Sequence, residues 1–308
     1  MSVDILALGE PMVEFNQTGE GGGSLYLQGF GGDTSNAAIA AARQGARVGY
    51  ISALGDDVYG GMLRDLWTRE GVAHDAVRTD AAAFTAVYFV THDDRGHHFS
   101  FFRKGSAASR IRPQDLPAEQ IRAARVLHLS GISAAISDSA CDTCLAAINI
   151  ARAAGVKVSF DTNLRLKLWP LARAGAVMRE LIRQSDICLP SYEDISAISG
   201  LDDADDLADF CLGLGARTVA LKLGDKGALL ADGGTRVRIA PHPCEPVDAT
   251  GAGDTFAGAL LARIVAGDTL QDAARYASVA AALSTEGFGA VAPIPHVQQV
   301  QNALNRAT

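Results

Sequence analysis

The sequence contains no apolar stretch long enough to cross a membrane, and it has few cysteines. A membrane-spanning helix needs about 20 consecutive apolar residues, and no uninterrupted run in this chain approaches that length. The 5 cysteines form no compact framework, which favours a reducing, cytoplasmic location. Cys141 and Cys144 lie in an Ala-rich stretch, where we expect them to pack inside a helix rather than to bind metal. The first residues lack the basic region and the long apolar region of a signal peptide.

Basic residues are fewer than acidic ones. The 27 Lys and Arg residues face 35 Asp and Glu residues, which gives a formal net charge of −8. Such a balance repels nucleic acid unless a basic patch overrides it. The basic residues at 103–112 are interleaved with Gly, Ser and Ala and form no such patch. We therefore expect neither a nucleic-acid partner nor a membrane partner.

Two further absences concern organisation and nucleotide binding. No internal repeat, low-complexity segment or linker divides the chain, which predicts a single domain over residues 1–308. The chain also lacks the Walker-type motif G-x-x-x-x-G-K-[ST], which excludes a P-loop kinase.

Short apolar runs alternate along the chain with Ala-rich amphipathic stretches. This alternation predicts an α/β fold with a mainly parallel central sheet and helices on both faces. The predicted strands cover residues 3–8, 48–52, 126–129, 156–160, 187–189, 218–221 and 228–230. The predicted helices cover residues 35–44, 139–154, 173–183 and 205–214.

Residues 11–31 and 84–104 interrupt this alternation, because each stretch contains strand patterns with no helix between them. We expect them to form one small β-sheet that projects from the main body as a lid over a site. An isolated sheet leaves edges and an apolar face bare. The sequence therefore also predicts a homo-oligomer, a dimer formed through the lid.

The most informative segment is Val247-Asp-Ala-Thr-Gly-Ala-Gly-Asp-Thr-Phe-Ala-Gly, which runs into an apolar helix starting near Ala252. Gly251 and Gly253 allow the backbone to approach a ligand and to point its N–H groups at it. The positive end of the helix dipole adds to this effect, so the segment predicts an anion site suited to a phosphoryl group in transfer. It is not a dinucleotide motif, because Phe256 takes the place of the third glycine.

Asp254 lies inside this predicted anion site. A carboxylate beside phosphate is unfavourable unless it has a chemical role, and removing the proton from an attacking hydroxyl is such a role. We therefore predict that Asp254 is the base of a phosphoryl transfer. The alternative is that it only caps the helix.

The order of the motifs resembles the PfkB (ribokinase-like) family of carbohydrate kinases over essentially the whole chain. One signature is Gly31-Gly-Asp-Thr-Ser-Asn-Ala-Ala, followed by Gly45 and by Leu54-Gly-Asp-Asp-Val-Tyr-Gly. The other is Asp248-Ala-Thr-Gly-Ala-Gly-Asp-Thr-Phe. The resemblance implies an α/β, ribokinase-like three-layer sandwich with a β-sheet lid. It implies that Asp254 is the catalytic base and that the backbone of Gly251, Ala252 and Gly253 forms the anion hole.

The same resemblance implies ATP and Mg²⁺ as cofactors. The strand and turn Leu221-Lys-Leu-Gly-Asp-Lys-Gly would hold the ATP phosphates and ribose, and the helix ending near Ala281 would wall the adenine pocket. The family often has Asn-x-x-Glu for organising magnesium, whereas this chain has Ser191-Tyr-Glu-Asp, so Asp194 or Glu193 would act through water. The ATP-binding residues implied by position are Asn163, Arg165, Lys222, Gly224, Asp225, Gly227, Gly251, Ala252 and Gly253.

Polar residues near the lid predict where a sugar binds. Gly32, Asp33 and Asn36 begin a helix that faces the lid, and Asp and Asn offer acceptors and donors to hydroxyl groups. Helix capping by Asp33 or Ser35 is the simpler interpretation, and both roles are compatible. Arg103 ends the presumed lid strand, and its guanidinium matches a carboxylate, which a neutral sugar lacks.

Arg165 and Asn163 follow a core strand at the carboxyl edge of the sheet, where ligands usually bind. For Arg103 and Arg165 alike, the alternative is a solvated surface charge.

Two strings, Arg103-Lys-Gly-Ser-Ala-Ala-Ser and D-x-N-x-R…L-W at residues 161–169, resemble one branch of the family, the 2-keto-3-deoxygluconate kinases. This implies a sugar acid that is phosphorylated at its terminal hydroxyl. Fructokinases share the pattern D-x-N-L-R-x-x-L-W and are the alternative. A non-catalytic regulator that binds a sugar or a nucleotide is the remote alternative. The residues implied to contact the sugar acid are Gly32, Tyr88, Phe101, where the branch commonly has Tyr, Arg103 and Arg165.

Overall fold

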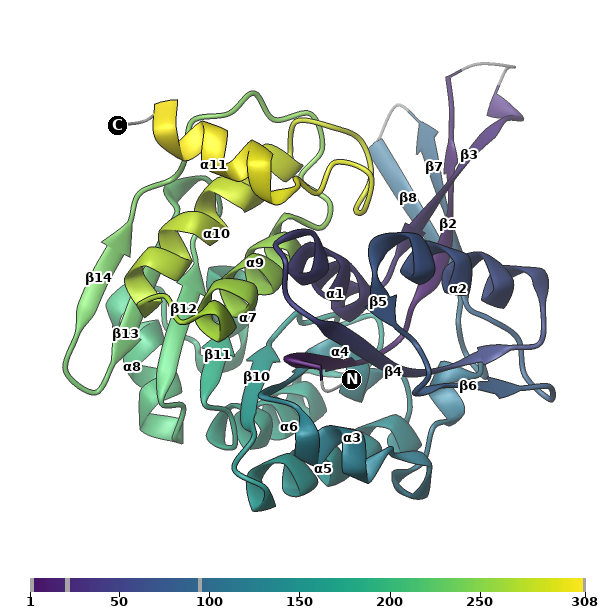
Figure 1. Cartoon of the computed structure of the whole chain (residues 1–308), viewed down its shortest axis with the longest axis horizontal. Helices are drawn as coiled ribbons and strands as arrows, with labels where there is room; N and C mark the ends of the chain where they lie inside the picture. Colours follow the sequence, from purple (N-terminus) through teal and green to yellow (C-terminus); the bar gives the residue numbers. More distant parts are fainter. Residues whose placement is uncertain (1–2, 20–22, 94–95, 307–308) are drawn as a thin grey trace.

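The computed structural model describes residues 3–19, 23–93 and 96–306, and it arranges them in three layers (Figure 1). A ten-stranded central sheet lies between two layers of helices. The spatial order of its strands is β14 (Arg236–Ile239), β13 (Ala228–Asp232), β12 (Thr218–Lys222), β11 (Ile187–Leu189), β10 (Lys157–Asp161), β9 (Val126–Ser130), β1 (Ile5–Leu8), β4 (Val48–Gly55) and β5 (Val72–Ala73), with β6 (Val77–Asp80) paired to β4.

The central sheet is mainly parallel, as predicted. Among the described strands of this sheet, only the pairs β12–β13 and β13–β14, at one edge, are antiparallel. Strand β1 shows why the sheet needs helices on both faces, because Ile5 packs into one apolar core and the next residue, Leu6, packs into the other. Every predicted strand is present, and β4 runs three residues beyond its predicted end, to Gly55.

The helices divide between the two cores. The core that contains Ile5 is covered by α1 (Asp33–Arg43), α2 (Val58–Glu70), α9 (Ala252–Ala266), α10 (Leu270–Ser284) and α11 (Val297–Arg306). The other is covered by α3 (Ala118–Ala123), α4 (Gly131–Ala135), α5 (Asp138–Ala153), α6 (Leu171–Arg183), α7 (Tyr192–Ser199) and α8 (Ala204–Leu214). Three short 3₁₀ turns are η2 (Ala108–Arg110), η3 (Pro113–Asp115) and η4 (Gly224–Lys226).

Helix α5 confirms the expectation for the close cysteine pair. Cys141 and Cys144 are both buried in this helix with free thiols. Their role is packing within the second core. No helix in the described ranges has the length and apolar character that crossing a membrane requires.

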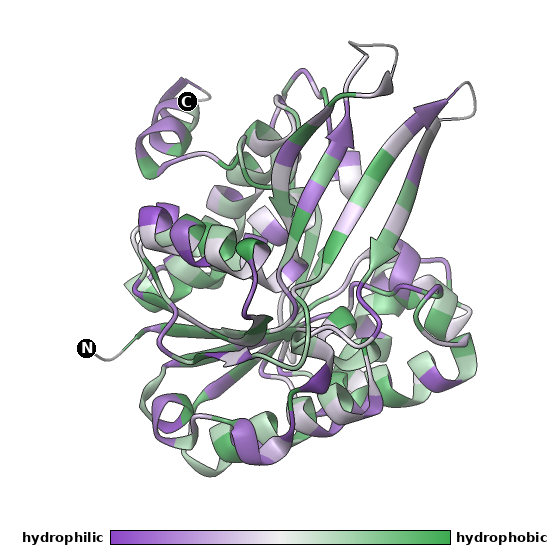
Figure 2. Ribbon diagram, turned by 90° about the vertical axis from the view of Figure 1, so that its right-hand side faces the viewer, coloured by the Kyte–Doolittle hydropathy of each residue, from purple (hydrophilic) through white to green (hydrophobic). Residues whose placement is uncertain are grey.

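A second sheet stands apart from the central one, and Figure 2 shows its strands rising away from the body. Its order is β3 (Tyr26–Gly31), β2 (Met12–Gln17), β7 (Val87–Asp93) and β8 (Gly96–Phe102). All four strands fall within the two stretches 11–31 and 84–104 that lack helices. The pair β2–β7 is parallel and the other two pairs are antiparallel, so this small sheet is mixed.

Candidate active site

The turn before α9 is the segment for which the sequence predicts an anion site. Gly251 precedes the helix with φ of 78°, a left-handed conformation that glycine adopts at little cost. A side chain at Gly251 would also lie 2.9 Å from the carbonyl oxygen of Ala290, so the position has no room for one. No side chain of the described residues caps α9. The N–H of Ala252, which was predicted to belong to the anion hole, donates instead to the carbonyl of Ala249 at 3.2 Å. The N–H groups of Gly253 and Asp254 have no acceptor among the described residues, so they can bind an anion.

Asp254 lies in the first turn of α9, where it is partly accessible. Its Oδ2 accepts a hydrogen bond of 2.8 Å from Nδ2 of Asn36 in α1. Desolvation and, next, the charge of Asp33 raise the pKa of Asp254 to about 8. Because Asp254 contacts a side chain on another helix and does not cap its own, the capping interpretation is wrong.

Asp33 brings a second carboxylate into this region. It is buried at the start of α1, and desolvation raises its pKa. Its Oδ2 accepts a hydrogen bond of 3.2 Å from Nδ2 of Asn163. Helix α1 has Gly32 as its N-cap residue without a side-chain cap, and Ser35 instead accepts a hydrogen bond from Nε1 of Trp67. Capping by Asp33 or Ser35 is therefore also wrong.

Lys222 supplies a positive charge beside the predicted anion site. Its Nζ forms an ion pair of 2.5 Å with Oδ2 of Asp161, which ends β10. A Cβ placed on Gly253 would lie 3.4 Å from the same Nζ. The ammonium group is thus adjacent to the backbone that would face a phosphoryl group. The sequence analysis assigned Lys222 to the nucleotide but did not find its partner Asp161.

The small sheet contributes aromatic and acidic side chains. Tyr88 stacks on Phe101 with 5.4 Å between the ring centroids, and its hydroxyl donates a short hydrogen bond to buried Glu14. Desolvation raises the pKa of Glu14. Desolvation and, next, the charge of Glu14 raise the pKa of Tyr88, and the charge of Asp254 adds to this rise. Tyr88 and Glu14 therefore lie on the side of the small sheet that faces Asp254.

Gly32 connects the small sheet to α1. Its φ is 106°, and a Cβ there would collide with the backbone of Glu10. Only glycine fits this close approach.

Arg103 has an internal partner that the sequence analysis missed. Its guanidinium forms an ion pair with the fully buried carboxylate of Glu10, and only 11% of the Arg103 side chain is exposed. Ser106 donates a hydrogen bond of 2.9 Å to Oε1 of the same carboxylate. The guanidinium also lies 5.6 Å from the centre of the Phe101 ring. Arg103 is therefore not a solvated surface charge, and it has a role that needs no carboxylate on the substrate.

The bend after β10 holds Asn163 and Arg165. Asn163 has φ of 33°, the one positive value among the described residues other than glycine. Such conformations persist where surrounding contacts enforce them, and here the Asn163 amide binds Asp33. Arg165 is exposed, and its charge counteracts the rise in the pKa of Asp33. The structure thus places both residues beside the predicted sugar site.

The predicted nucleotide turn follows β12. Gly224, Asp225 and Lys226 form η4, and the N–H of Leu223 donates to the carbonyl of Gly227 at 2.8 Å. This turn comes directly after Lys222, and its three residues are exposed to solvent. Its predicted contacts with ATP stay a prediction.

Asp194 is already engaged within the protein. Its Oδ2 accepts hydrogen bonds from the Thr162 hydroxyl at 2.8 Å and from the Leu164 N–H at 3.0 Å. Ser191 caps α7 by accepting from the N–H of Asp194, which accounts for a small hydroxyl residue at that position. Within the described ranges, no group of three or more His, Cys, Asp or Glu residues could hold a metal ion.

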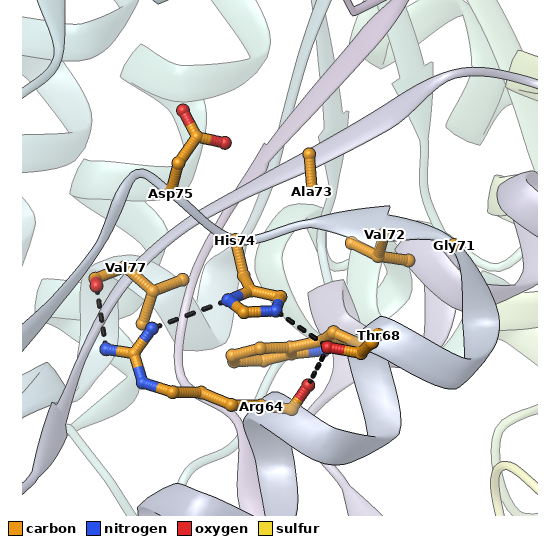
Figure 3. A pocket seen from close by; sticks show the side chains of 9 residues that line it. Arg64, Thr68, Gly71, Val72, Ala73, His74, Asp75 and Val77 are labelled. Carbon is orange, nitrogen blue, oxygen red and sulfur yellow. Dashed lines mark hydrogen bonds between the residues drawn. The ribbon is translucent and has the colours of Figure 1, made fainter.

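A separate hollow of about 530 Å³ lies at the far edge of the molecule, between α2 and the segment that leads to β6. Figure 3 shows that His74 in its wall lies between Arg64 and Thr68, to which it is hydrogen-bonded. Because these polar groups bind one another, the hollow presents no group that calls for a ligand. We assign no function to it.

Comparisons with known proteins find relatives that match nearly the whole chain. Fructokinase-1 of Oryza sativa subsp. japonica is 32% identical over 319 residues, which cover 98% of this chain and 98% of that relative. The fructokinase of Vibrio cholerae O395, solved in a fructose, ADP and calcium ion bound form, is 27% identical with a TM-score of 0.88, covering 99% of this chain and 100% of that one.

The aminoimidazole riboside kinase of Salmonella enterica, solved with aminoimidazole riboside and an ATP analog, is 28% identical with a TM-score of 0.87, covering 97% and 99% of the two chains. These likenesses confirm the predicted ribokinase-like fold. Residues 4–297 match the pfkB family carbohydrate kinases. The chain therefore belongs to the PfkB family and is a carbohydrate kinase.

Proposed function

We propose that this kinase transfers the γ-phosphoryl group of ATP to a hydroxyl group of a neutral keto sugar, with fructose as the first candidate. One observation carries the proposal. The carboxylate of Asp254 lies at the N-terminus of α9, within reach of Asn36 and beside the Lys222 ammonium group. This arrangement supports a role for Asp254 as a base next to a site for a phosphoryl group.

The proposed mechanism uses the chain's own groups in three roles. Asp254 takes the proton from the substrate hydroxyl as the hydroxyl oxygen attacks the γ-phosphorus. The backbone N–H groups at the start of α9 stabilise the negative charge on the transferring phosphoryl oxygens. Lys222 lies beside them and offsets part of the same charge. Asn36 donates a hydrogen bond to Asp254 and holds the base in position.

Magnesium fits this site as a metal bound mainly through the ATP phosphates. The described residues contain no cluster that could bind a metal alone, and Mg²⁺ in kinases keeps waters and substrate phosphates as ligands. Asp194 and Glu193 are the residues that would reach it through water. When bound, the metal would neutralise phosphate charge.

Charge near the sugar site supports a neutral substrate. The Arg103 guanidinium is paired with Glu10 inside the protein. Glu14 and Asp33 add buried carboxylates on the sugar side of Asp254. A carboxylate on the substrate would be repelled by these neighbouring carboxylates. The relatives that are named fructokinases favour the same substrate.

2-Keto-3-deoxygluconate is the second candidate, and a specific observation favours it. Nε of Arg103 is buried and has no hydrogen-bond partner among the described residues. A substrate carboxylate could accept a bond from this group. Arg165 lies exposed near Asp33 and could add a second positive charge.

Side-by-side kinetics decide between these substrates. ATP consumption should be measured with fructose, 2-keto-3-deoxygluconate and ribose under identical conditions. We expect the highest kcat/KM for fructose. Robust turnover of the sugar acid with little turnover of fructose would overturn the first candidate and establish the second. No ATP-dependent turnover of any sugar would favour the remote alternative of a regulator.

Dimerisation through the small sheet and a cytoplasmic location stay predictions. The small sheet exposes large apolar side chains, with 65% of Leu27 and 56% of Phe102 accessible. Such surfaces favour association, and we propose a second copy of this chain as the partner. Light scattering of the wild type and of Leu27→Asp would measure the change in mass.

A further inference from the structure

Residues 285–295 form the back wall of the anion-site turn. The N–H groups of Val247 and Asp248 donate to the carbonyl of Thr285 at 2.7 and 3.0 Å. The N–H of Gly289 donates in turn to Oδ2 of Asp248 at 2.9 Å. The next residue, Ala290, packs directly against Gly251. The position of this wall therefore limits where the turn before α9 can lie.

Arg43, near the end of α1, holds the far side of this wall. Its Nη1 donates to the carbonyls of Val291 at 3.1 Å, Ala292 at 3.4 Å and Ile294 at 2.5 Å. Its Nε and Nη2 bind the two oxygens of Glu70 in α2 at 2.8 Å each. Only 10% of the Arg43 side chain and 15% of the Glu70 side chain are exposed.

The hydrogen bonds and the charge of the Arg43 guanidinium are matched by its neighbours. Three converging carbonyl oxygens carry partial negative charges, and a guanidinium offers the several fixed donors that they need. Glu70 balances the charge, and its hydrogen bond with Arg43 lowers the pKa of Glu70. Gln44 adds a bond of 2.6 Å from Nε2 to the carbonyl of Pro295. A lysine could not satisfy the carbonyls and Glu70 at once.

Helix α1 thus contacts the catalytic apparatus at both ends. Its first turn supplies Asn36, which binds the base Asp254. Its last turn supplies Arg43, which binds the wall behind the anion site. Between these ends, α1 packs closely against α9, because Gly258 lies on the backbone of Ala37. One rigid helix therefore sets the relative position of the base and the anion site.

We propose that Arg43 is a positioning residue for phosphoryl transfer, which acts by fixing residues 291–294 and, through them, the anion-site turn 248–251. This role does not depend on which sugar is the substrate. Misplacing reacting groups by about 1 Å costs up to 100-fold in rate. We expect Arg43→Ala to lower kcat by about 10- to 100-fold. The KM for the sugar should stay close to the wild-type value, because the predicted sugar site lies at the other end of α1.

The experiment compares Arg43→Ala and Arg43→Lys with a control, Arg183→Gln. Arg183 also forms a bidentate ion pair, with Glu180 of its own helix α6, which packs on the other face of the central sheet from α1 and α9. Kinetics use whichever sugar the wild type consumes fastest, with folded protein quantified by circular dichroism. We expect the control to keep wild-type kcat and Arg43→Lys to recover part of the loss.

Millimolar guanidinium separates positioning from general stability. At millimolar concentration the ion is too dilute to act as a denaturant, but it can occupy the space left in Arg43→Ala and should raise the kcat of this variant. Restored kcat with unchanged sugar KM supports the proposal. Wild-type kcat in folded Arg43→Ala overturns it, as does a loss that guanidinium does not reverse. If Arg43→Ala does not fold, the kinetics of Arg43→Lys are the test. A lowered kcat with an unchanged sugar KM then supports the proposal, and a wild-type kcat overturns it.

Discussion

The buried ion pair between Arg103 and Glu10 allows a stringent test of how the small sheet is attached to the body. We consider the variants Arg103→Met and Glu10→Gln and the double variant. Met keeps most of the length of Arg without its charge, and Gln keeps the shape of Glu. Each single change leaves one charge of the pair buried without its partner, because Glu10 is inaccessible and Arg103 is 11% exposed.

The magnitude follows from this burial. Removing one partner of a buried pair costs roughly 3–5 kcal/mol, whereas replacing both partners by neutral groups costs far less. Arg103→Met should fall in the lower part of this range, because Ser106 still donates to Glu10 at 2.9 Å. The double variant should be more stable than the sum of the two single changes implies, with a coupling energy of about 2–3 kcal/mol.

The effect of pH on Arg103→Met gives an independent check. Desolvation already raises the pKa of Glu10 above its ordinary value of 4.5, and Arg103 is the largest opposing influence. Without Arg103, the pKa in the folded protein rises further. Above pH 4.5, Glu10 is ionised in the unfolded chain but keeps its proton in the folded variant. A rise in pH therefore favours the unfolded state, and the variant loses more stability relative to the wild type. The variant should be closest to the wild type at low pH.

Urea unfolding at pH 5 and pH 7.5 measures both effects. With an m value of about 2–3 kcal/mol/M for a chain of this size, the single variants should unfold at roughly 1–2 M less urea at the higher pH. Simple additivity of the single and double variants would refute the reasoning, and so would a deficit that is independent of pH. Arg47→Met is the control, because Arg47 forms an exposed ion pair with Asp4 and such pairs contribute about 0–1 kcal/mol.

Three further predictions concern catalysis. Asp254→Asn should keep sugar binding in calorimetry and lower kcat by about 10²–10⁴; turnover above half of the wild-type value would show that Asp254 is not the base. Because the pKa of Asp254 is raised to about 8 and a base must be deprotonated, kcat should rise with pH and level off above that value. Asp33→Asn removes the largest like charge acting on Asp254 and should move the midpoint of this profile to lower pH, so an unmoved midpoint would contradict the assignment. Gly253→Val would place a branched side chain beside Nζ of Lys222, which lies 3.4 Å from the position of a Cβ, and should abolish turnover while sugar binding persists; Gly61→Ala, where a Cβ meets nothing within 4 Å, is the matched control.

Local chemistry explains which parts of the site could be predicted from the sequence. The turn before α9 is defined by adjacent residues, because Gly251 adopts the left-handed conformation of the turn and Asp254 follows in the first turn of the helix. Most of the central strands are likewise marked by continuous apolar runs that are buried on both faces. Such signals need no knowledge of distant contacts.

Helix α2 shows where local patterns fail. It carries two glycines near its start, Gly60 and Gly61, and glycine lowers helix propensity by about 1 kcal/mol. Only four of its 13 residues are buried, so the apolar stripe is weak. What stabilises it is tertiary packing, chiefly Trp67 in the core against Tyr50 with 5.0 Å between ring centroids. The sequence gives little indication of such a contact.

The acidic partners were missed for a different reason. Glu10 follows β1, and Asp161 ends β10. Each contacts a cation far away in the sequence, Arg103 and Lys222 respectively. The rule that the carboxyl ends of parallel strands meet at one edge brings Asp161 near Lys222, since both end parallel strands, so this pair was within reach of sequence reasoning. No such rule links Glu10 to Arg103. Glu10 follows a strand of the central sheet and Arg103 follows a strand of the small sheet, and the sequence does not show how the two sheets pack together. An arginine on a strand that faces a site therefore gives no information on substrate charge until its internal partner is known.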